Sequence, residues 1–292
     1  MHTGDEEIRF LESVLFEALG HTPKITDTRL VTGGSINTAV RLATEQGTYF
    51  VKWSEAHSDD LFRTEARGLD LLAQTGTFTI PRVIHQGKQG YKAYLMLEFI
   101  EPGPQRPTYW KEFGESLAQL HSHTHSTFGL DYSNYIGTLP QRNTPRNNAV
   151  EFFIEERLKV QAGMALYNNM ITPQLHESFQ KLYEALPGII PNERPALVHG
   201  DLWSGNVITD ADGGVCLVDP APHYGIREAE IAFTFLFGGF DPTFYQSYNN
   251  TFPMEDDFEQ RVPIYNLYPL LVHVNLFGHS YVKAVEKVLS RF

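Results

Sequence analysis

One short polar stretch limits what this 292-residue chain can fold into. The stretch is HGDLWSGN at residues 199–206, and it stands between two apolar runs, Leu197–Val198 and Val215–Val218. Short apolar runs bounded by turn residues are typical of buried strands. The residues between them include Gly, Asp, Ser and Asn, which favour tight turns. The sequence therefore predicts a strand, a polar loop and a second strand that leads to Asp219.

The polar residues of this loop have the spacing of a phosphotransferase catalytic loop, H-x-D-x-x-x-x-N, followed by a strand that delivers a second carboxylate. A hydroxyl that attacks a phosphoryl group needs a carboxylate to orient it and accept its proton, and Asp201 fits this role. The Asn206 amide and the Asp219 carboxylate offer the hard oxygen ligands that an ATP-bound Mg²⁺ prefers. An ordinary turn uses the same residue types, so the spacing alone leaves both interpretations open.

The length and charge of the chain narrow the possibilities further. A chain of 292 residues exceeds the size at which one hydrophobic core usually divides, so two lobes are expected. A hydrophobic content of 42% is ordinary for a folded globular protein. The formal net charge of -12 disfavours general binding to nucleic acid or to a membrane surface, because both are anionic. An anionic ligand must therefore meet a local positive charge or a metal.

The cysteine content and the amino terminus favour a cytoplasmic location. Cys216 is the single cysteine, so it cannot form an internal disulfide, and a reducing compartment is expected. Residues 1–9 contain no apolar segment of the kind found in secretory signals. No segment approaches the roughly 20 apolar residues that cross a bilayer.

A glycine pair lies between two predicted strands near the amino terminus. Residues Ile25–Thr32 and Thr38–Leu42 have strand patterns, and GGSIN at 33–37 separates them. Such a turn can fold over ATP phosphates and offer them backbone N–H groups. The candidate phosphate-binding residues are Gly33, Gly34, Ser35 and Asn37. A plain hairpin accounts for the same glycines.

A lysine and a glutamate follow in the pattern of a phosphate-anchoring pair. Lys52 lies near the end of the β-rich run Thr48–Trp53, and Glu65 lies in the helical pattern Leu61–Ala73. A strand lysine that pairs with a helix glutamate holds the α- and β-phosphates of ATP in kinases. The alternative is a solvated strand-edge lysine and a glutamate that pairs with the arginines beside it in sequence.

An apolar strand that ends in a Pro/Gly-rich segment marks the expected boundary between lobes. Ala93–Ile100 is apolar except for Glu98 and runs into Glu101–Pro104. This is a candidate hinge, in which backbone groups of Glu98, Phe99 and Ile100 would bind adenine. We therefore expect an ATP-binding lobe over residues 1–103 and a catalytic and substrate-binding lobe over 104–292.

The second half of the chain is mainly helical in pattern. Helices are expected at Tyr109–His121, Glu151–Met170, Leu175–Leu186, Glu228–Phe237 and through the tail 258–292, with a polar Gly/Pro loop at Asn134–Asn143. Two histidines four residues apart within 121–125 could bind a metal. No acidic or cysteine residue lies close to them in sequence, and histidines also suit the end of a helix. The predicted fold is α+β and bilobal, with a small β-rich first lobe and a larger, mainly helical second lobe.

The chain resembles the fructosamine/ketosamine-3-kinase family, which has the protein-kinase-like fold. The segments that carry the resemblance are HGDLWSGN at 199–206, DPAPHYGIREAE at 219–230, LFGGF at 236–240, the tail from 244 to 278, IGTLPQRN at 136–143 and GGSIN at 33–37. Together they span nearly the whole chain. The Trp in HGDLWSGN, joined to DPA and a following YG-x-RE, is more specific than the HGD shared by related small-molecule kinases.

The resemblance implies ATP-dependent phosphorylation of the hydroxyl on the third sugar carbon of a ketoamine, the adduct of a reducing sugar and an amine. The adducts are of the fructosamine or ribulosamine kind, small or protein-bound, and the unstable product can release the amine. Asp201 resembles the catalytic base, Asn206 and Asp219 the Mg²⁺ ligands, and Lys52 with Glu65 the pair that anchors ATP. Candidate substrate contacts are Trp203, His199, Tyr224 and Arg227, although an aromatic residue such as Trp203 also serves as packing.

The chain departs from the family pattern at four positions. His223 stands where an aromatic residue is usual, Glu230 where an aspartate is usual, and Val272 where Asn is expected. Ser35 stands where some members carry a cysteine, so control through a thiol in that loop is not expected. No catalytic group is lost, but the preference for amine or sugar is left open.

Three alternatives remain beside a ketoamine kinase. The nearest is a kinase of another small hydroxyl compound, such as an aminoglycoside or choline. A protein kinase is disfavoured because the chain lacks an Asp-Phe-Gly turn and an Ala-Pro-Glu segment. A non-catalytic nucleotide-binding module would be expected to lack one of Asp201, Asn206, Asp219 or Lys52, and all four are present. Oligomeric state is left open.

Overall fold

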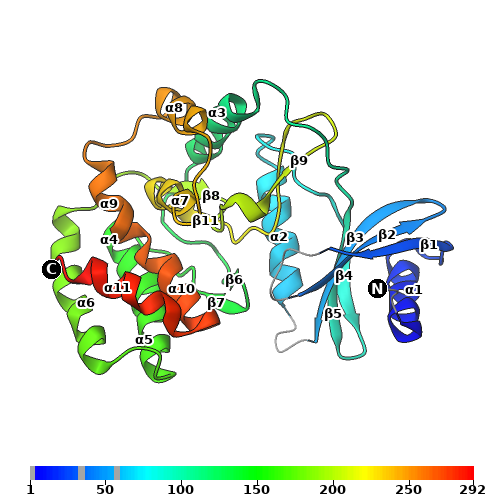
Figure 1. The fold of residues 1–292 in the computed structure, drawn as a ribbon, viewed down its shortest axis with the longest axis horizontal. Helices are drawn as coiled ribbons and strands as arrows, with labels where there is room; N and C mark the ends of the chain where they lie inside the picture. Colours follow the sequence, from blue (N-terminus) through cyan, green and yellow to red (C-terminus); the bar gives the residue numbers. More distant parts are fainter. Residues whose placement is uncertain (1–3, 32–36, 56–59) are drawn as a thin grey trace. The chain divides into compact units, whose positions relative to one another are not determined.

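The chain divides into two compact units (Figure 1). The computed structural model describes residues 4–31, 37–55 and 60–292. The first unit comprises Met1–Arg106 together with Val207–Asp219, and the second comprises Pro107–Asn206 and Pro220–Phe292. The predicted boundary between lobes near residue 103 stays a prediction. The first compact unit also contains a later segment of the chain, residues 207–219, which we call the excursion. The β-sheet in the first part of the chain and the helices in the second confirm the expected fold class.

The first unit is built on a five-stranded antiparallel sheet in the order β1-β2-β3-β5-β4. Its strands are β1 (Ile25–Leu30), β2 (Thr38–Thr44), β3 (Gly47–Glu55), β4 (Val83–Gln89) and β5 (Lys92–Glu98). Two helices accompany the sheet, α1 (Asp5–Leu19) and α2 (Leu61–Ala73), the second with the predicted bounds. In Figure 1 they lie on opposite sides of the sheet.

Strand alternation decides which side chains meet each helix. In β5, Tyr94 and Met96 pack with α1, whereas Leu95 and Leu97 pack with α2. Successive side chains of a strand point to opposite faces, which produces this division. In β3, Val51 and Trp53 belong to the cluster with α1. Lys52 between them therefore points to the α2 side.

The excursion of the first unit is a short hairpin of β9 (Val207–Thr209) and β10 (Val215–Leu217). Three backbone hydrogen bonds tie it to the rest of the unit. The Gly103 N–H donates to the Thr209 carbonyl, the Arg106 N–H to the Gly213 carbonyl and the Leu217 N–H to the Thr79 carbonyl. Cys216 is fully buried in β10, and burial raises the pKa of its thiol to about 12. β10 is the predicted second apolar strand, and it leads to Asp219.

The second unit is mainly helical (Figure 1). Its helices are α3 (Tyr109–Ser122), α4 (Ala149–Phe152), α5 (Lys159–Tyr167), α6 (Pro173–Ala185), α7 (Arg227–Thr234), α8 (Pro242–Thr251), α9 (Phe258–Tyr265), α10 (Leu267–Phe277) and α11 (Val282–Leu289), with a π-helical segment, Phe153–Leu158, between α4 and α5. β8 (Ala196–Val198) pairs with β11 (His223–Gly225). Within the described residues, no helix is both long and apolar enough to cross a membrane.

One difference from the expected structure concerns a stretch that precedes α4. The stretch 134–143, expected as a polar loop, forms a hairpin of β6 (Asn134–Ile136) and β7 (Leu139–Gln141). The Asn134 and Gln141 side chains are buried and donate to the carbonyls of Pro222 and Ala221. Their polarity satisfies buried main chain rather than water, which is why the pattern looked like an exposed loop.

Helix α8 was not expected from the sequence, although its start has a local signal. The Asp241 carboxylate accepts a hydrogen bond from the Thr243 N–H, and Pro242 is the first helical residue. Both features are typical of a helix N-terminus. The predicted tail helix is divided into three, and Gly278, with φ +89, ends α10.

Candidate active site

In the first unit, Lys52 lies between two carboxylates. Its Nζ is 2.6 Å from Glu65 Oε1 and 2.6 Å from Asp219 Oδ1. Burial by itself lowers the pKa of Lys52, but Asp219 and then Glu65 outweigh burial, and the net pKa lies above the ordinary value. Burial raises the pKa of Glu65 to about 7, although Lys52 opposes this shift. The unit thus contains a buried ammonium group that remains charged.

The other predicted nucleotide-binding positions also fall in the first unit. Glu98 ends β5, and its backbone N–H donates to the Arg82 carbonyl at 3.0 Å. Phe99 lies under the Arg41 guanidinium, 5.2 Å from ring centre to guanidinium carbon, and Ile100 follows it. Asn37 precedes β2, and its buried Oδ1 has no hydrogen-bond partner among the described residues. Gly33, Gly34 and Ser35 lie outside the described residues, and all these binding roles stay predictions.

In the second unit, the loop that carries Asp201 begins directly after β8. Gly200 has φ +86, and a Cβ on it would lie 2.0 Å from the Ala221 carbonyl oxygen, so only glycine fits. Asn206 Nδ2 donates to Asp201 twice, to the backbone oxygen at 2.8 Å and to Oδ2 at 2.9 Å. The amide group of Asn206 therefore holds Asp201 and keeps its own oxygen for another partner.

A buried carboxylate on α7 holds the chain just before Asp201. Glu230 accepts hydrogen bonds from the Gly200 N–H at 2.6 Å, from the His199 N–H at 3.0 Å and from His121 Nε2 at 2.9 Å. Burial by itself raises the pKa of Glu230, but the bonds from His121 and Gly200 outweigh it, and the net pKa is lowered. A charged Glu230 thus fixes both residues that precede Asp201.

The histidine at the end of α3 has the acidic partner that its sequence neighbours lack. His121 is fully buried, with Nε2 on Glu230 and Nδ1 2.7 Å from the Tyr248 hydroxyl. Glu230 lies more than a hundred residues away in the chain, so local sequence could not reveal the pair. Across the described ranges, no group of three or more His, Cys, Asp or Glu side chains could hold a metal ion. His121 supports the loop through Glu230.

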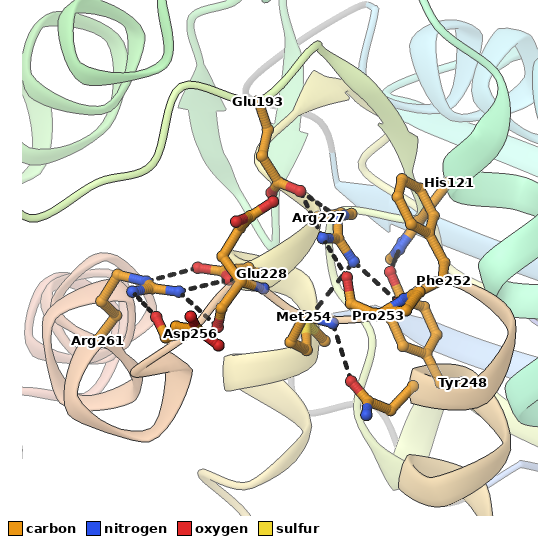
Figure 2. A network of polar contacts seen from close by, with 12 residues as sticks. His121, Glu193, Arg227, Glu228, Tyr248, Phe252, Pro253, Met254, Asp256 and Arg261 are labelled. Carbon is orange, nitrogen blue, oxygen red and sulfur yellow. Dashed lines mark hydrogen bonds and ion pairs between the residues drawn. The ribbon is translucent and has the colours of Figure 1, made fainter.

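Two buried ion pairs flank this support (Figure 2). Arg227 contacts Glu193 and donates to the carbonyls of Phe252 and Pro253. Arg261 makes two hydrogen bonds of 2.7 Å to the Glu228 carboxylate. These pairs connect α7 to the segment after α8 and to α9. Each charge has a partner, so the pairs fix α7, which carries Glu230.

A cavity of the second unit has Asp201 in its wall and about 670 Å³ of empty space, the open mouth included. Most of its wall is aromatic or aliphatic, with rings from Phe152, Phe153, Phe233, Tyr265 and Tyr268. Its polar wall includes Arg157, His223, Glu230 and His273 besides Asp201. An apolar cavity with a few polar groups beside a reactive carboxylate is the usual form of a small-molecule site.

The four predicted substrate contacts do not line this cavity. His199 and Arg227 are buried, Trp203 packs against Phe237 with ring centres 6.1 Å apart, and Tyr224 stacks on His125 at 4.9 Å. The Trp203 ring also covers Gly205, where a Cβ would lie 2.3 Å from it. These contacts favour packing for Trp203, and the substrate roles of all four stay predictions.

Sequence reasoning missed several cavity residues, among them Arg157, Tyr268 and His273. Arg157 lies four residues after Phe153 in the predicted helix Glu151–Met170, a spacing that would place both on one helix face. A charged residue on an apolar helix face was the available signal. His223 and Val272, noted as departures from the family pattern, also line the cavity. Together with Glu230, three of the four departures therefore lie in the wall beside Asp201.

We expect Glu230→Gln to lower kcat about tenfold and to lower the melting temperature, because the amide removes a buried charge that accepts three hydrogen bonds. KM for ATP should stay close to the wild-type value. Steady-state kinetics and thermal unfolding would measure both effects. Glu230→Asp, which restores the carboxylate, should lie between wild type and Glu230→Gln, and Glu177→Gln on the surface of α6 should change neither quantity. Wild-type kcat and melting temperature in Glu230→Gln would contradict the role of the carboxylate.

Comparisons with known proteins agree on one family. Residues 9–292 match the family described as fructosamine kinase. A probable ketoamine kinase from Enterococcus faecium is 39% identical over 264 residues, which are 90% of this chain and 94% of that protein. The crystal structure of a protein assigned as a fructosamine-3-kinase from Haemophilus somnus has a TM-score of 0.86 at 30% identity, with 96% of each chain covered.

The fold extends to more distant kinases. An aminoglycoside phosphotransferase, crystallised in a ternary complex with AMP-PNP and hygromycin B, has a TM-score of 0.62 at 15% identity, with 96% of this chain and 98% of that chain covered. This likeness concerns the fold alone. The family match covers nearly the whole chain, and the chain therefore belongs to the fructosamine kinase family.

Proposed function

We propose that this protein phosphorylates the hydroxyl on the third sugar carbon of ketoamines, of the fructosamine or ribulosamine kind, with ATP as the phosphate donor. Membership of the fructosamine kinase family supports this activity. The observation that carries it is the cavity beside Asp201, because a phosphotransferase needs an acceptor site at its catalytic carboxylate. The activity is of a repair type, since the product can release the amine.

Asp201 is the proposed base. Asn206 Nδ2 donates to Asp201 Oδ2 and so orients the carboxylate. Glu230 fixes the two residues before Asp201. The carboxylate would orient the acceptor hydroxyl and accept its proton as the hydroxyl oxygen attacks the γ-phosphorus. The aromatic cavity wall would exclude water, which otherwise competes as an acceptor.

Lys52 is the proposed anchor of the ATP phosphates. It is buried and charged, with Glu65 and Asp219 as its present partners. Phosphate oxygens are acceptors for an ammonium group, and Glu65 keeps the lysine in place when it binds them. Lys52 also supplies the local positive charge that a chain of net charge -12 needs to bind an anion.

Asn206 and Asp219 are the proposed Mg²⁺ ligands. Their chemistry fits this ion, since Asp219 offers a carboxylate and Asn206 offers an amide oxygen. The NH₂ group of the same amide is bound to Asp201. Mg²⁺ is usually held by one or two protein groups together with substrate phosphates, so a larger cluster is not needed. When bound, the ion would neutralise phosphate charge.

The decisive experiment measures ADP release with ATP and three acceptors, a fructosyl- or ribulosyl-lysine, choline and an aminoglycoside. We expect activity with the ketoamine that disappears when EDTA removes Mg²⁺ and returns when Mg²⁺ is added in excess. Phosphorylation of the third carbon would be checked by NMR of the product. Activity with choline or the aminoglycoside alone would overturn the proposal and favour a kinase of another small hydroxyl compound.

A further inference from the structure

One buried basic side chain of the protein differs from the others in the partners of its charge. In the described part of the chain, four of these side chains are buried, namely Lys52, Arg157, Arg227 and Arg261. Three of the four have a carboxylate partner within the protein, Glu65 and Asp219 for Lys52, Glu193 for Arg227 and Glu228 for Arg261. No ion pair to Arg157 is found among the described residues. It is also the member of the four that lines the cavity beside Asp201.

The contacts of Arg157 are with neutral groups. Nη1 donates to the carbonyls of Arg142 and Glu156, and Nη2 donates to Asn143 Oδ1 at 2.8 Å. Its guanidinium carbon lies 4.5 Å from the centre of the Phe152 ring and 5.4 Å from that of Tyr268, and both rings are in the cavity wall. These contacts orient the guanidinium and offset part of its desolvation, but they do not neutralise its charge.

Glu156, the carboxylate whose charge acts on Arg157, already pairs with two other arginines. The Glu156 carboxylate lies 2.7 Å from Arg146 Nη2 and 3.3 Å from Arg142 Nε. Burial lowers the pKa of Arg157 to about 10, because Tyr268 and Glu156 oppose burial only in part. The group is still charged at neutral pH. A buried charge without a counterion is costly, which is why such charges are usually paired.

The other polar groups in the cavity wall do not supply a second positive charge. His223 Nδ1 is 3.2 Å from the Ala221 carbonyl and His273 Nδ1 is 2.7 Å from that of Pro269. Burial lowers the pKa of both rings, so both are neutral at neutral pH. Glu230 is occupied by the loop before Asp201. The wall thus offers one positive group, Arg157, and one carboxylate with a catalytic role, Asp201.

We propose that Arg157 binds an anionic group of the acceptor, so that the preferred substrates are ketoamines that carry an acid group. This inference rests on the proposed function and names the substrate class of the same cavity. The acid group can come from two sources, a carboxylate on the amine, as in an adduct of a free amino acid, or a phosphate on the sugar. In either case the acid group complements the charge of Arg157, and Asp201 stays available for the acceptor hydroxyl.

The test compares acceptors that differ only in charge. Fructosylglycine and fructosylglycinamide differ by the carboxylate, and ribulosylglycinamide with and without a 5-phosphate differ by the phosphate. For wild type, we expect kcat/KM to be about 30-fold higher for the acidic member of one pair, as for a charge-assisted bond. The pair that shows the preference identifies the source of the acid group.

The Arg157→Met variant should reduce this preference to about twofold, mainly through KM of the acidic member. Arg157→Lys keeps the charge and should retain part of the preference. Arg291→Met, the same change at an exposed arginine after α11, should leave the ratio unchanged. A purely structural role of Arg157 predicts equal losses for both members of a pair, and that result would overturn the inference.

Failure of the inference and failure of the proposed function are distinguishable. If wild type phosphorylates the acidic and neutral members of both pairs equally, the inference is wrong and the ketoamine kinase activity stands. If wild type phosphorylates none of the four acceptors, nor a lysine ketoamine, the proposed function itself is wrong. The wild-type ratios decide the question even where a variant is poorly folded.

Discussion

Asp201→Asn should lower kcat about 10³-fold with a ketoamine acceptor, because the amide cannot accept the proton of the attacking hydroxyl. Affinity for ATP should change little, since the proposed phosphate anchor is Lys52. The fold should also persist. An asparagine oxygen can still accept the hydrogen bond from Asn206 Nδ2 that Asp201 Oδ2 accepts at 2.9 Å. Single-turnover kinetics and calorimetric titration with ATP would separate the loss of chemistry from any loss of binding.

A matched control for this variant is Asp70→Asn, which makes the same substitution at an exposed position of α2. It should leave kcat and the affinity for ATP at wild-type values. Near-normal turnover in Asp201→Asn would remove Asp201 as the base. Loss of ATP binding in parallel with turnover would point instead to a structural role of the loop.

Much of the fold could be predicted because local patterns determine it. The helix over 61–73 has an apolar periodicity and forms with the predicted bounds, and the strands around Lys52 alternate as expected. The hairpin at 134–141 could not be predicted, because its polar side chains bond to main chain 80 and 88 residues away. Buried polar residues of this kind look like loop residues in a single sequence.

The residues of the site are also of two kinds, those that local sequence reveals and those that only the fold brings together. Asp201 and Asn206 are close in sequence and meet, as do Lys52 and Glu65, which lie on neighbouring elements. By contrast, Arg157 follows no chemical motif, and its significance depends on the absence of a carboxylate that only the fold can reveal. Glu230 was visible only as a departure from a family pattern. Its role in holding the loop required the contact between α7 and β8.

The net charge of the chain explains why the proposed binding of ATP depends so strongly on Lys52. With a net charge of -12, the chain repels ATP at long range, so binding depends on short-range positive groups. Lys52 is kept charged by two carboxylates, and Arg157 by neutral acceptors and aromatic rings. These two buried cations are therefore suited to different anions, Lys52 to the phosphates of ATP and Arg157 to the proposed acid group of an acceptor.

Lys52→Met should lower kcat/KM for ATP about 10²–10³-fold, because the charge on the phosphates loses its proposed protein partner. The same change should lower the free energy of unfolding by about 3 kcal/mol, since a buried carboxylate, Glu65, is left without its ammonium partner. Steady-state kinetics and urea unfolding would measure the two effects. Wild-type KM and kcat in this variant would contradict the role of Lys52.

The loss of stability in Lys52→Met should depend on pH in a defined direction. The pKa of Glu65 is about 7 in the folded wild type, against an ordinary value of 4.5, and loss of Lys52 should raise it further. A carboxyl group with a raised pKa favours the folded state below its unfolded pKa, and this contribution is lost as pH rises through its folded pKa. Lys52→Met should therefore lose more stability, relative to wild type, at pH 8.5 than at pH 6. The double variant Lys52→Met/Glu65→Gln has no such carboxylate. It should recover most of the free energy of unfolding, and its loss of stability relative to wild type should not increase between pH 6 and pH 8.5. It should remain as inactive as Lys52→Met. The double variant would thus separate the phosphate-binding role of the lysine from its role in folding.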